Sequence, residues 1–383
     1  MSVTAAKGFT ASGIAAGIKE NGNPDLALVV NNGPRLAAAG VFTSNRVKAA
    51  PVLWSEQVLK GGQVSAVVLN SGGANACTGP KGFQDTHATA ERAAAVLDVN
   101  AGEVAVASTG LIGVLLPMDK VLAGVETAAA QLGPHGGEKA AIAIKTTDTV
   151  HKTSVRTGDG WTVGGMAKGA GMLAPGLATM LVVLTTDADV DAESLDKALR
   201  AATRTTFDRV DSDGCMSTND TVLLLASGAS EITPDPAGFA EAVRAVCDDL
   251  GQQLIRDAEG ASKDIKVEVV GAATEEDAVE VGRSIARNNL LKCAIHGEDP
   301  NWGRVLSAIG TTRAAFEPDQ LNVAINGVWV CKNGGVGEDR ELVDMRYREV
   351  HIVADLAAGA ATATIWTNDL TADYVHENSA YSS

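Results

Sequence analysis

The sequence predicts an α/β protein with mixed sheets. Short apolar runs that end in glycine or a small polar residue are typical of buried strands, and they alternate with amphipathic stretches typical of helices. The last third of the 383-residue chain is richer in strand-like runs than the part before it. This length is sufficient for a sizeable core and for two lobes, and no linker, repeat or low-complexity tract marks a boundary.

The first half of the chain alternates predicted strands and helices. The runs DLALVVNN from Asp25, SAVVLNSG from Ser65 and EVAVASTG from Glu103 each indicate a buried strand. Helical spacing predicts helices over residues 83–97 and 118–132.

The second half begins with an apolar run, 180–184, long enough for a buried strand. A helix should follow Asp191, which is a favourable N-cap residue, and another should follow Thr274, which forms a capping pair with Asp277. A long amphipathic helix is expected over 237–258, with Phe239, Val243, Val246, Leu250 and Leu254 on its apolar face. The remaining predicted strands cover 221–226, 266–270, 321–331, 349–355 and 361–367.

The composition excludes several classes of protein. The formal net charge of −16 argues against nucleic acid or an anionic membrane as a partner, because such surfaces require clustered Lys and Arg. Five dispersed cysteines without a CxxC pair indicate neither a disulfide framework nor a zinc site, and they fit a reducing cytoplasm. Six histidines lack a ligand spacing, so we expect no metal. We find no membrane-length apolar run and no outward-targeting pattern at the N-terminus.

The segment KGAGMLAPGLATMLVVLTTDA, from Lys168, places Thr179 at the junction between a glycine-rich loop and an apolar strand. A threonine hydroxyl is a weak nucleophile unless a base lies beside it, and its own α-amino group becomes such a base if the bond between Ala178 and Thr179 is cut. The alternative is that Thr179 is only a β-branched residue that opens a strand. The residues of this segment alone leave both interpretations open.

Eight ordered blocks resemble the ornithine acetyltransferase family, the arginine-biosynthetic enzymes that pass an acetyl group from N-acetylornithine to glutamate. The resemblance covers nearly the whole chain. The sequence departs from the usual pattern at Gly176-Leu177, where Asn-Met is expected, at Ala170, where Ser is common, and at Ser383, where Thr is frequent. The matching blocks are LNSGGANACTG from Leu69, VASTGLIG from Val106, KTTDT from Lys145, AKGAGML from Ala167, DSDGCMSTNDT from Asp211, RDAEGASK from Arg256, GEDPNWGR from Gly297 and DLTADYV from Asp369.

The resemblance implies a fold and a nucleophile. The fold would be a layered α-β-β-α-like sandwich with mixed sheets, reminiscent of N-terminal nucleophile hydrolases. The chain would cleave itself between Ala178 and Thr179 into interlocked fragments, 1–178 and 179–383. Thr179 would be the nucleophile, and Thr109 with Gly110 would form the oxyanion hole. Two copies of each fragment would assemble.

The resemblance also implies a set of substrate-binding residues. Lys168 would pair with a substrate carboxylate, and Glu259 would bind the cationic end of ornithine or its amine. Composition alone predicts a frayed C-terminal tail, whereas a role in the site requires a docked one. The EDPNWG run between His296 and Arg304, like DSDGCMSTNDT, would shape the site or a subunit contact. The full predicted set is Thr146 or Thr147, Lys168, Thr179, Glu259, Asn378 and Ser383.

Three other functions are alternatives to the transferase. GAGMLA, residues 169–174, fits a dinucleotide-binding loop and would indicate an NAD-dependent oxidoreductase, but that loop requires a following helix where Pro175 and Gly176 stand. A self-processed threonine amidohydrolase or aminopeptidase would share the catalytic core and use water. A non-enzymatic ligand-binding protein would need no processing. For the transferase we expect no cofactor and small-molecule substrates, with acetyl-CoA retained as an alternative acetyl donor.

Overall fold

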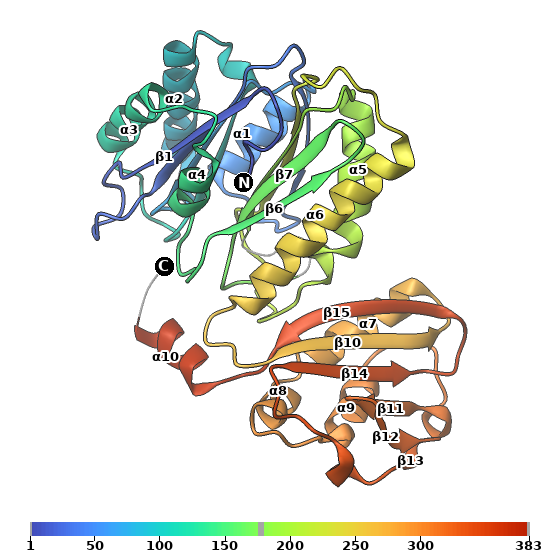
Figure 1. Cartoon of the computed structure of the whole chain (residues 1–383). Helices are drawn as coiled ribbons and strands as arrows, with labels where there is room; N and C mark the ends of the chain where they lie inside the picture. Colours follow the sequence, from blue (N-terminus) through green and yellow to red (C-terminus); the bar gives the residue numbers. More distant parts are fainter. Residues whose placement is uncertain (1, 175–179, 381–383) are drawn as a thin grey trace. The chain divides into compact units, whose positions relative to one another are not determined.

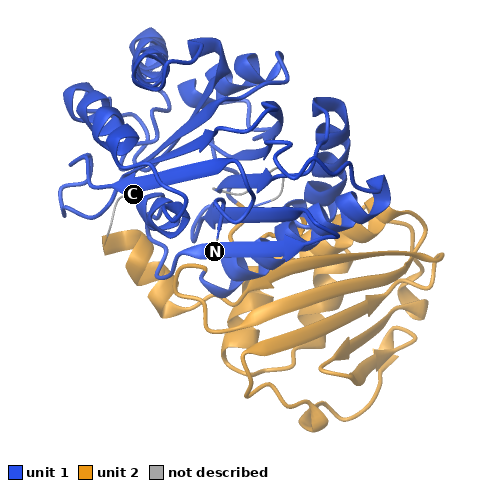
Figure 2. Ribbon diagram, turned by 45° about the horizontal axis from the view of Figure 1, so that its top comes forward, with its two compact units in different colours: residues 1–208, 215–257, 383 blue, residues 209–214, 258–382 orange. Residues whose placement is uncertain are grey.

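The computed structural model describes residues 2–174 and 180–380, and it divides into two compact units (Figures 1 and 2). Unit 1 takes in Met1–Asp208 and Cys215–Asp257, and unit 2 takes in Arg209–Gly214 and Ala258–Ser382. This division follows chain contacts and differs from the predicted fragments 1–178 and 179–383. The predicted cleavage point lies outside the described residues and stays a prediction.

The first sheet of unit 1 has the strand order β1-β2-β4-β5. Only β4 and β5 run parallel to each other among its pairs. The helices α2 (Gly79–Leu97) and α3 (Met118–Ala130) pack on its outer face, where Ala90, Ala93, Val121 and Val125 contact strand residues. The strand bounds are β1 Phe9–Ile14, β2 Leu26–Asn31, β4 Ala66–Ser71 and β5 Val104–Thr109.

The second sheet of unit 1 has the strand order β3-β9-β8-β7-β6, in which β8 and β9 are parallel. The helices α5 (Ala192–Thr205) and α6 (Pro236–Arg256) cover its outer face (Figure 1). Two further helices, α1 (Ala50–Leu59) and α4 (Gly137–Ala143), contact the sheets. The strand bounds are β3 Ala37–Phe42, β6 Lys152–Thr157, β7 Thr162–Lys168, β8 Leu181–Thr186 and β9 Thr221–Ala226.

The core of unit 1 lies between these two sheets. Val29 and Leu69 from the first sheet belong to one buried cluster with Val183 and Leu223 from the second. With helices on both outer faces, the order of layers is α-β-β-α, as the sequence resemblance predicts. Strands covered on both faces bury every residue, which explains why β2, β4, β8 and β9 are continuous apolar runs in the sequence.

Unit 2 contains a six-stranded mixed sheet with the order β13-β12-β11-β14-β10-β15. Its core joins the sheet to α7 (Glu275–Ala286), α8 (Asn289–His296) and α9 (Trp302–Ile309), and α10 (Ala372–Ala380) follows the last strand. The strand bounds are β10 Asp264–Ala272, β11 Asn322–Ile325, β12 Val328–Lys332, β13 Gly335–Val336, β14 Glu349–Asp355 and β15 Ala361–Asn368.

The predicted single strand over 321–331 is wrong. The structure divides this run into β11 and β12, which pair antiparallel through Ile325 and Val328. Asn326 and Gly327 connect them with φ values of 46° and 85°. Positive φ at both central residues is typical of a two-residue hairpin turn, and the Asn-Gly dipeptide is the usual sequence signal for it.

The predicted helix starts are confirmed by their caps. The carboxylate of Asp191 accepts the backbone N–H of Ser194 at 2.7 Å at the start of α5. The hydroxyl of Thr274 accepts the backbone N–H of Asp277 at 3.1 Å at the start of α7. The described residues include no helix that is both long and apolar enough to cross a membrane.

Candidate functional site

Thr109 and Gly110 lie where the parallel strands β4 and β5 end together. The backbone N–H groups of Gly72 and Gly73 both donate to the carbonyl oxygen of Thr109, at 2.9 and 3.0 Å. Gly110 has a φ of 130°, and a Cβ at this position would lie 2.5 Å from the nitrogen of Gly73. Two backbone segments therefore meet at van der Waals distance, and only glycine fits at position 110.

Lys168, the last residue of β7, reaches the end of β5 from the other sheet. Its side chain is buried, with 1% exposure, and its Nζ lies 3.4 Å from Oγ1 of Thr109. The structure thus brings together two residues that the sequence predicted separately, one for the oxyanion hole and one for substrate binding. A buried ammonium beside a hydroxyl is suited to attract an anionic group.

The loop that carries Thr146 and Thr147 is tied to the end of β7 by Asp148, a residue the sequence reasoning did not select. Oδ2 of Asp148 accepts the backbone N–H of Thr146 at 3.0 Å, and Oδ1 accepts the backbone N–H of Gly169 at 2.6 Å. Burial by itself would raise the pKa of this carboxyl. The nearby charges of Lys168 and Lys152, together with hydrogen bonds from Lys152 and from the backbone of Gly169, hold the pKa of Asp148 well below its usual range.

Lys152, at the start of β6, connects Asp148 to the end of α6. Its fully buried Nζ donates to Oδ1 of Asp148 at 2.7 Å and to Oδ2 of Asp257 at 2.5 Å. Asp257 in turn accepts the backbone N–H of Thr149 at 3.1 Å. Alternating charges therefore fix both sides of the 145–149 loop, and Lys152 was not identifiable from sequence because its partners are 4 and 105 residues away.

The first described residue after the predicted cleavage point is Met180, and its backbone is held by the start of β9. Oδ1 of Asp220 accepts the N–H of Met180 at 3.1 Å, and the N–H of Thr221 donates to the carbonyl oxygen of Met180 at 3.1 Å. Burial raises the pKa of Asp220 well above its ordinary value. Ala178 and Thr179 themselves lie outside the described residues.

Asn219 connects the two loops at the end of the first sheet. Its Nδ2 donates to the carbonyl oxygens of Ala74 and Ser108, at 2.6 and 2.8 Å. Ser108 also donates through its hydroxyl to Oδ1 of Asn70 at 2.6 Å. The DSDGCMSTNDT block, which the sequence reasoning left out of the catalytic list, therefore supplies Asn219 and Asp220 as structural supports of this site.

Glu259 and Asn378 meet within unit 2. Nδ2 of Asn378, on α10, donates to Oε2 of Glu259 at 2.9 Å. The start of α10 packs against Gly260, whose carbonyl oxygen accepts the Thr371 hydroxyl at 2.7 Å. The tail is helical over Ala372–Ala380 rather than frayed as composition alone predicts. Ser383 lies outside the described residues.

The helix predicted over 237–258 ends before Glu259 is reached. The helix α6 ends at Arg256, so Glu259 belongs to the loop that follows. The nearby carboxyl of Glu377 has a raised pKa because of its partial burial and the negative charges of Glu259 and Asp373. Glu259 thus lies in an acidic setting, which favours a cationic ligand group.

His296 does not form a catalytic triad with its neighbours Ser262 and Asp369. Both contacts of the ring use the same nitrogen: Nδ1 lies 2.9 Å from Oδ2 of Asp369 and 3.2 Å from the hydroxyl of Ser262. A triad requires opposite ring nitrogens to face the carboxylate and the hydroxyl. Arg304 donates to the carbonyl oxygen of Leu290. These contacts fit a shaping role within unit 2.

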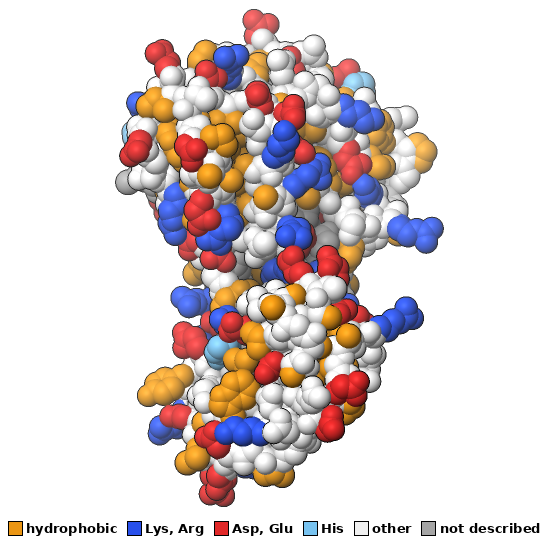
Figure 3. All heavy atoms as spheres, turned by 90° about the vertical axis from the view of Figure 1, so that its right-hand side faces the viewer, with side chains coloured by type: hydrophobic (Ala, Val, Ile, Leu, Met, Phe, Trp, Pro, Cys, Tyr) orange, Lys and Arg blue, Asp and Glu red, His pale blue; other side chains and the backbone are white. Residues whose placement is uncertain are grey.

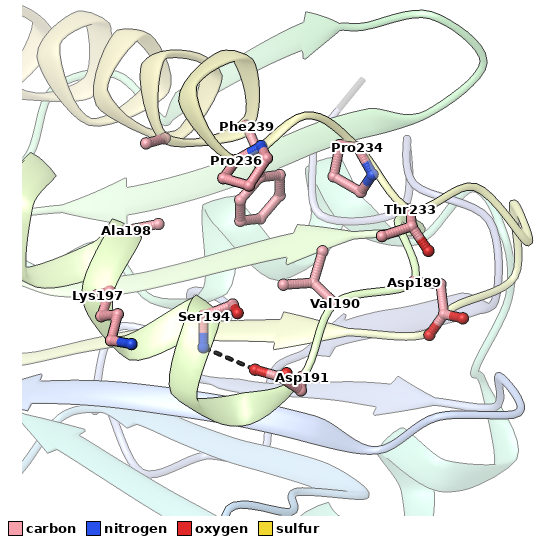
Figure 4. A pocket seen from close by; sticks show the side chains of 11 residues that line it. Asp189, Val190, Asp191, Ser194, Lys197, Ala198, Thr233, Pro234, Pro236 and Phe239 are labelled. Atoms are coloured by element: carbon pink, nitrogen blue, oxygen red, sulfur yellow. Dashed lines mark hydrogen bonds between the residues drawn. The ribbon is translucent and has the colours of Figure 1, made fainter.

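The cavity drawn in Figure 4 is formed by residues of unit 1. It has a volume of about 290 Å³, is lined by residues such as Val190, Pro236 and Phe239, and includes none of the predicted site residues. Residues 169–174 form no helix, and Pro175 and Gly176, where the dinucleotide-loop alternative requires a helix, lie outside the described residues. In the described ranges, no group of three or more His, Cys, Asp or Glu side chains could hold a metal ion.

Comparison with known proteins identifies the family. The model of the ArgJ family matches residues 10–383. The chain is 92% identical to the arginine biosynthesis bifunctional protein ArgJ of Streptomyces avermitilis and 64% identical to the protein of that name from Thermobifida fusca, and each match covers 100% of both chains. A chain of the crystal structure of ornithine acetyltransferase complexed with ornithine from Mycobacterium tuberculosis is 60% identical. That match covers 47% of this chain and 96% of that chain, with a TM-score of 0.45.

These matches confirm the family predicted from the eight sequence blocks. The relatives align with the chain from end to end, so the similarity does not come from one shared module. The chain therefore belongs to the ArgJ family and is an acyltransferase of arginine biosynthesis.

Proposed function

We propose that this enzyme transfers the acetyl group of N2-acetylornithine to glutamate in a ping-pong cycle, after cleaving itself between Ala178 and Thr179. The observation that carries the proposal is the contact of Lys168 with Thr109, in which a buried ammonium lies 3.4 Å from the hydroxyl at the end of β5. Both amino-acid substrates carry a carboxylate for the ammonium to bind. The names of the relatives, which refer to a bifunctional protein of arginine biosynthesis, are consistent with this pair of substrates.

Self-cleavage would begin when the hydroxyl of Thr179 attacks the carbonyl carbon of Ala178. The carbon–nitrogen bond breaks as the nitrogen of Thr179 takes up the hydroxyl proton, which leaves an ester. Water then hydrolyses the ester and frees both the hydroxyl and the α-amino group. The hydrogen bonds from Asp220 and Thr221 to Met180 support this step, because they fix the backbone next to Thr179.

Acetyl transfer would then use the same hydroxyl. The α-amino group of Thr179 takes its proton while the oxygen attacks the acetyl carbonyl, and the proton passes to the departing amine of ornithine. Thr109 and Gly110 would stabilise the oxyanion, and one such donor is typically worth about 3 kcal/mol in the transition state. Glutamate then enters, its amine attacks the acetyl ester, and the reverse proton transfers release N-acetylglutamate.

Residues of unit 2 are also assigned to substrate binding. Glu259 is proposed to bind the cationic end of ornithine, and Asn378 and Ser383 are proposed as further substrate-binding residues. The described hydrogen bond between Asn378 and Glu259 supports a common role for these two residues. Thr146 or Thr147 is proposed to contact the substrate from the 145–149 loop.

The main rival is an amidohydrolase or aminopeptidase that uses the same threonine and releases the acyl group to water. Transfer requires that water be kept from the acyl-enzyme. The near-complete burial of Lys168 and Thr109, exposed by 1% and 3%, favours transfer over hydrolysis.

Several further features belong to this proposal. The reaction needs no cofactor, and acetyl-CoA is an alternative acetyl donor. The active assembly would contain two copies of each fragment, and the strand β8 from the second fragment pairs with β7 from the first, which supports interlocking.

Five free cysteines fit a cytoplasmic location. On the face in Figure 3, basic side chains stand among acidic ones, which fits small-molecule partners better than nucleic acid.

Intact mass spectrometry of purified wild type and of the Thr179→Ala and Thr179→Ser variants tests the proposal. We expect two fragments from wild type, and one added acetyl group on the second fragment after brief incubation with N-acetylornithine. Thr179→Ala should stay uncut and unacetylated, whereas Thr179→Ser keeps a hydroxyl and should be cut. Loss of that acetyl group on addition of glutamate, with N-acetylglutamate as product, supports transfer. Release as free acetate would favour the hydrolase, and an uncut, unmodified wild type would overturn the threonine mechanism.

A further inference from the structure

The carboxylate of Asp148 contacts both unit 1 segments to which substrate binding is assigned. One oxygen accepts the backbone N–H of Thr146 at 3.0 Å, and the other accepts the backbone N–H of Gly169, the residue after Lys168, at 2.6 Å. A single side chain therefore joins the 145–149 loop to the end of β7. Hydrogen bonds from backbone N–H groups to a carboxylate are stronger than neutral ones, so this link is firm.

Asp148 is itself held in place. Lys152 donates to it at 2.7 Å from a fully buried position, and the same ammonium is anchored on Asp257 at 2.5 Å. Asp257 accepts hydrogen bonds from the backbone and the hydroxyl of Thr149, at the far end of the same loop. Described hydrogen bonds to both carboxylate oxygens thus fix the side chain of Asp148.

The charge of Asp148 also acts on Lys168. The two side chains are close enough for Lys168 to lower the pKa of Asp148, and both are almost completely buried. In a medium of low dielectric, an ionised carboxylate attracts a neighbouring ammonium strongly. The carboxylate of Asp148 therefore influences the position of Lys168 as well as that of the loop.

We propose that Asp148 is a positioning residue for substrate binding, which holds Lys168 and the 145–149 loop in the arrangement that receives the carboxylate of an amino-acid substrate. This inference rests on the proposed function, which assigns substrate binding to Lys168 and to Thr146 or Thr147. Asp148 itself does not contact the substrate. It acts through the groups that do.

The variant Asp148→Asn separates positioning from simple charge. The amide keeps one oxygen for one backbone N–H but turns an NH2 group toward the other donors. If Asp148 positions the site, the loop and Lys168 lose their fixed arrangement, and the Kd of glutamate should rise about tenfold or more. If Asp148 only neutralises Lys168, its removal strengthens the attraction for a carboxylate, and the Kd should fall. The two roles therefore predict changes of opposite sign.

Titration calorimetry with glutamate and with ornithine, neither of which carries an acetyl group to transfer, measures these Kd values without turnover. Steady-state kinetics on the same proteins should give a larger change in KM than in kcat, because the lost interactions act on binding of both substrates. Asp249→Asn is the matched control. It also changes a carboxylate that joins α6 to β6, through the Ser154 hydroxyl at 2.6 Å, and lies away from the 145–149 loop. Its Kd values should equal those of wild type.

A second variant covers the case in which Asp148→Asn does not fold. Asp257→Asn loosens the Thr149 end of the loop and leaves the carboxylate of Asp148 intact, so the Kd of glutamate should rise by a smaller factor. An unchanged or lower Kd in a folded Asp148→Asn protein, or in Asp257→Asn if the first is not obtained, would overturn the proposal. A wild type that binds both amino acids but forms no acetyl-threonine counts against the proposed mechanism alone. A wild type that binds neither amino acid would overturn both the proposed function and the positioning role of Asp148.

Discussion

Two buried carboxyl groups of unit 1 have pKa values that are shifted in opposite directions. Asp148 is surrounded by the ammonium groups of Lys152 and Lys168, and its pKa is held well below the usual range. Asp220 accepts a backbone N–H from Met180 and, within the described residues, forms no ion pair, and burial raises its pKa well above the ordinary value. Burial is the first cause in both cases and Lys168 lowers both pKa values, but only Asp148 has the further cation Lys152, which donates directly to it.

This difference indicates two kinds of support for one site. An ionised, fully bonded carboxylate such as Asp148 is rigid, because every hydrogen bond it accepts is strengthened by charge. Burial of Asp220 raises its pKa, so its surroundings favour the protonated form more than those of Asp148 do. Asp220 holds the backbone of Met180, whereas Asp148 holds the 145–149 loop and the end of β7.

The largest predicted effect comes from breaking the ion network around Asp148. Lys152→Met removes the buried ammonium and leaves Asp148 and Asp257 without their shared partner. Loss of one member of a buried ion pair typically costs about 3–5 kcal/mol, so the thermal midpoint should fall sharply. Differential scanning calorimetry at a fixed protein concentration measures this change.

The control replaces all three charged residues of the network. A triple variant, Lys152→Met with Asp148→Asn and Asp257→Asn, removes all three charges together, and it should recover part of the lost stability because neither Asp148 nor Asp257 then leaves a buried carboxylate without Lys152. A single Lys152→Met variant as stable as wild type would show that the network contributes little to folding, and the contrast with Asp220 would then lose its energetic basis.

The second prediction concerns the pH dependence at Asp220. Its folded-state pKa is raised, by burial above all, while the Met180 hydrogen bond, Ser217 and Lys168 oppose the rise and Asp208 adds to it. A raised pKa means that the folded state binds the proton more tightly than the unfolded state. The stability from this group is therefore fully present below about pH 4 and is lost as the pH rises through the folded-state value.

The variant Asp220→Asn cannot ionise, so it escapes this loss. The difference in thermal midpoint, variant minus wild type, should become more positive as the pH rises above about 4. Thermal melts in a series of buffers of equal ionic strength measure it. A difference that stays constant across the series would mean that Asp220 does not titrate with a raised pKa in the folded protein.

Sequence reasoning succeeded where one local pattern decides the structure. The strand β9 was predicted with its observed bounds, and β5 nearly so, because helices and a second sheet cover both faces and leave continuous apolar runs. The strand β6 was missed. Its sequence, KTSVRT, is polar, and it forms a strand because it pairs with β7 at the edge of the sheet.

The helix α10 was missed for a related reason. It has no buried residue and lacks an apolar stripe, and it is held by its contacts with the Gly260 loop. In the site, Thr109, Gly110 and Lys168 stood in recognisable blocks, but the assignment of Asp148 required three partners that no spacing in the sequence reveals. The local sequence therefore predicts the backbone of the site, whereas long-range contacts determine which charged side chains interact.

A third carboxyl, in unit 2, extends the comparison to an intermediate case. Asp211 accepts a hydrogen bond from Nε of Arg287 at 2.8 Å, yet burial raises its pKa to about 6 against the opposing charges of Arg287, Arg283 and Lys292. These three cations thus offset burial only in part. Stability from this group should be fully present below about pH 4 and lost between about pH 4 and pH 6, by up to about 3 kcal/mol. Asp211→Asn should flatten the decline of the thermal midpoint across that window, and NMR titration of the labelled carboxyl should give the pKa directly. A midpoint near pH 4 would contradict this prediction.

The smallest predicted effect is at Asp191, where a carboxylate accepts a backbone N–H without being buried. Its pKa is lowered, chiefly by the hydrogen bond from Ser194 at the start of α5, and almost no desolvation opposes the shift. Asp191→Ala removes this cap and should cost about 1 kcal/mol at neutral pH. Because the folded-state pKa is lowered, that cost should shrink as the pH falls below about 4. Glu193→Ala, in the exposed first turn of the same helix, is the control and should leave the thermal midpoint unchanged within error. Equal losses from both variants would mean that general helix electrostatics, rather than the cap, stabilises α5. In that case a hydrogen bond to a carboxyl group would contribute to stability at Asp148 and Asp220 only because those two groups are buried.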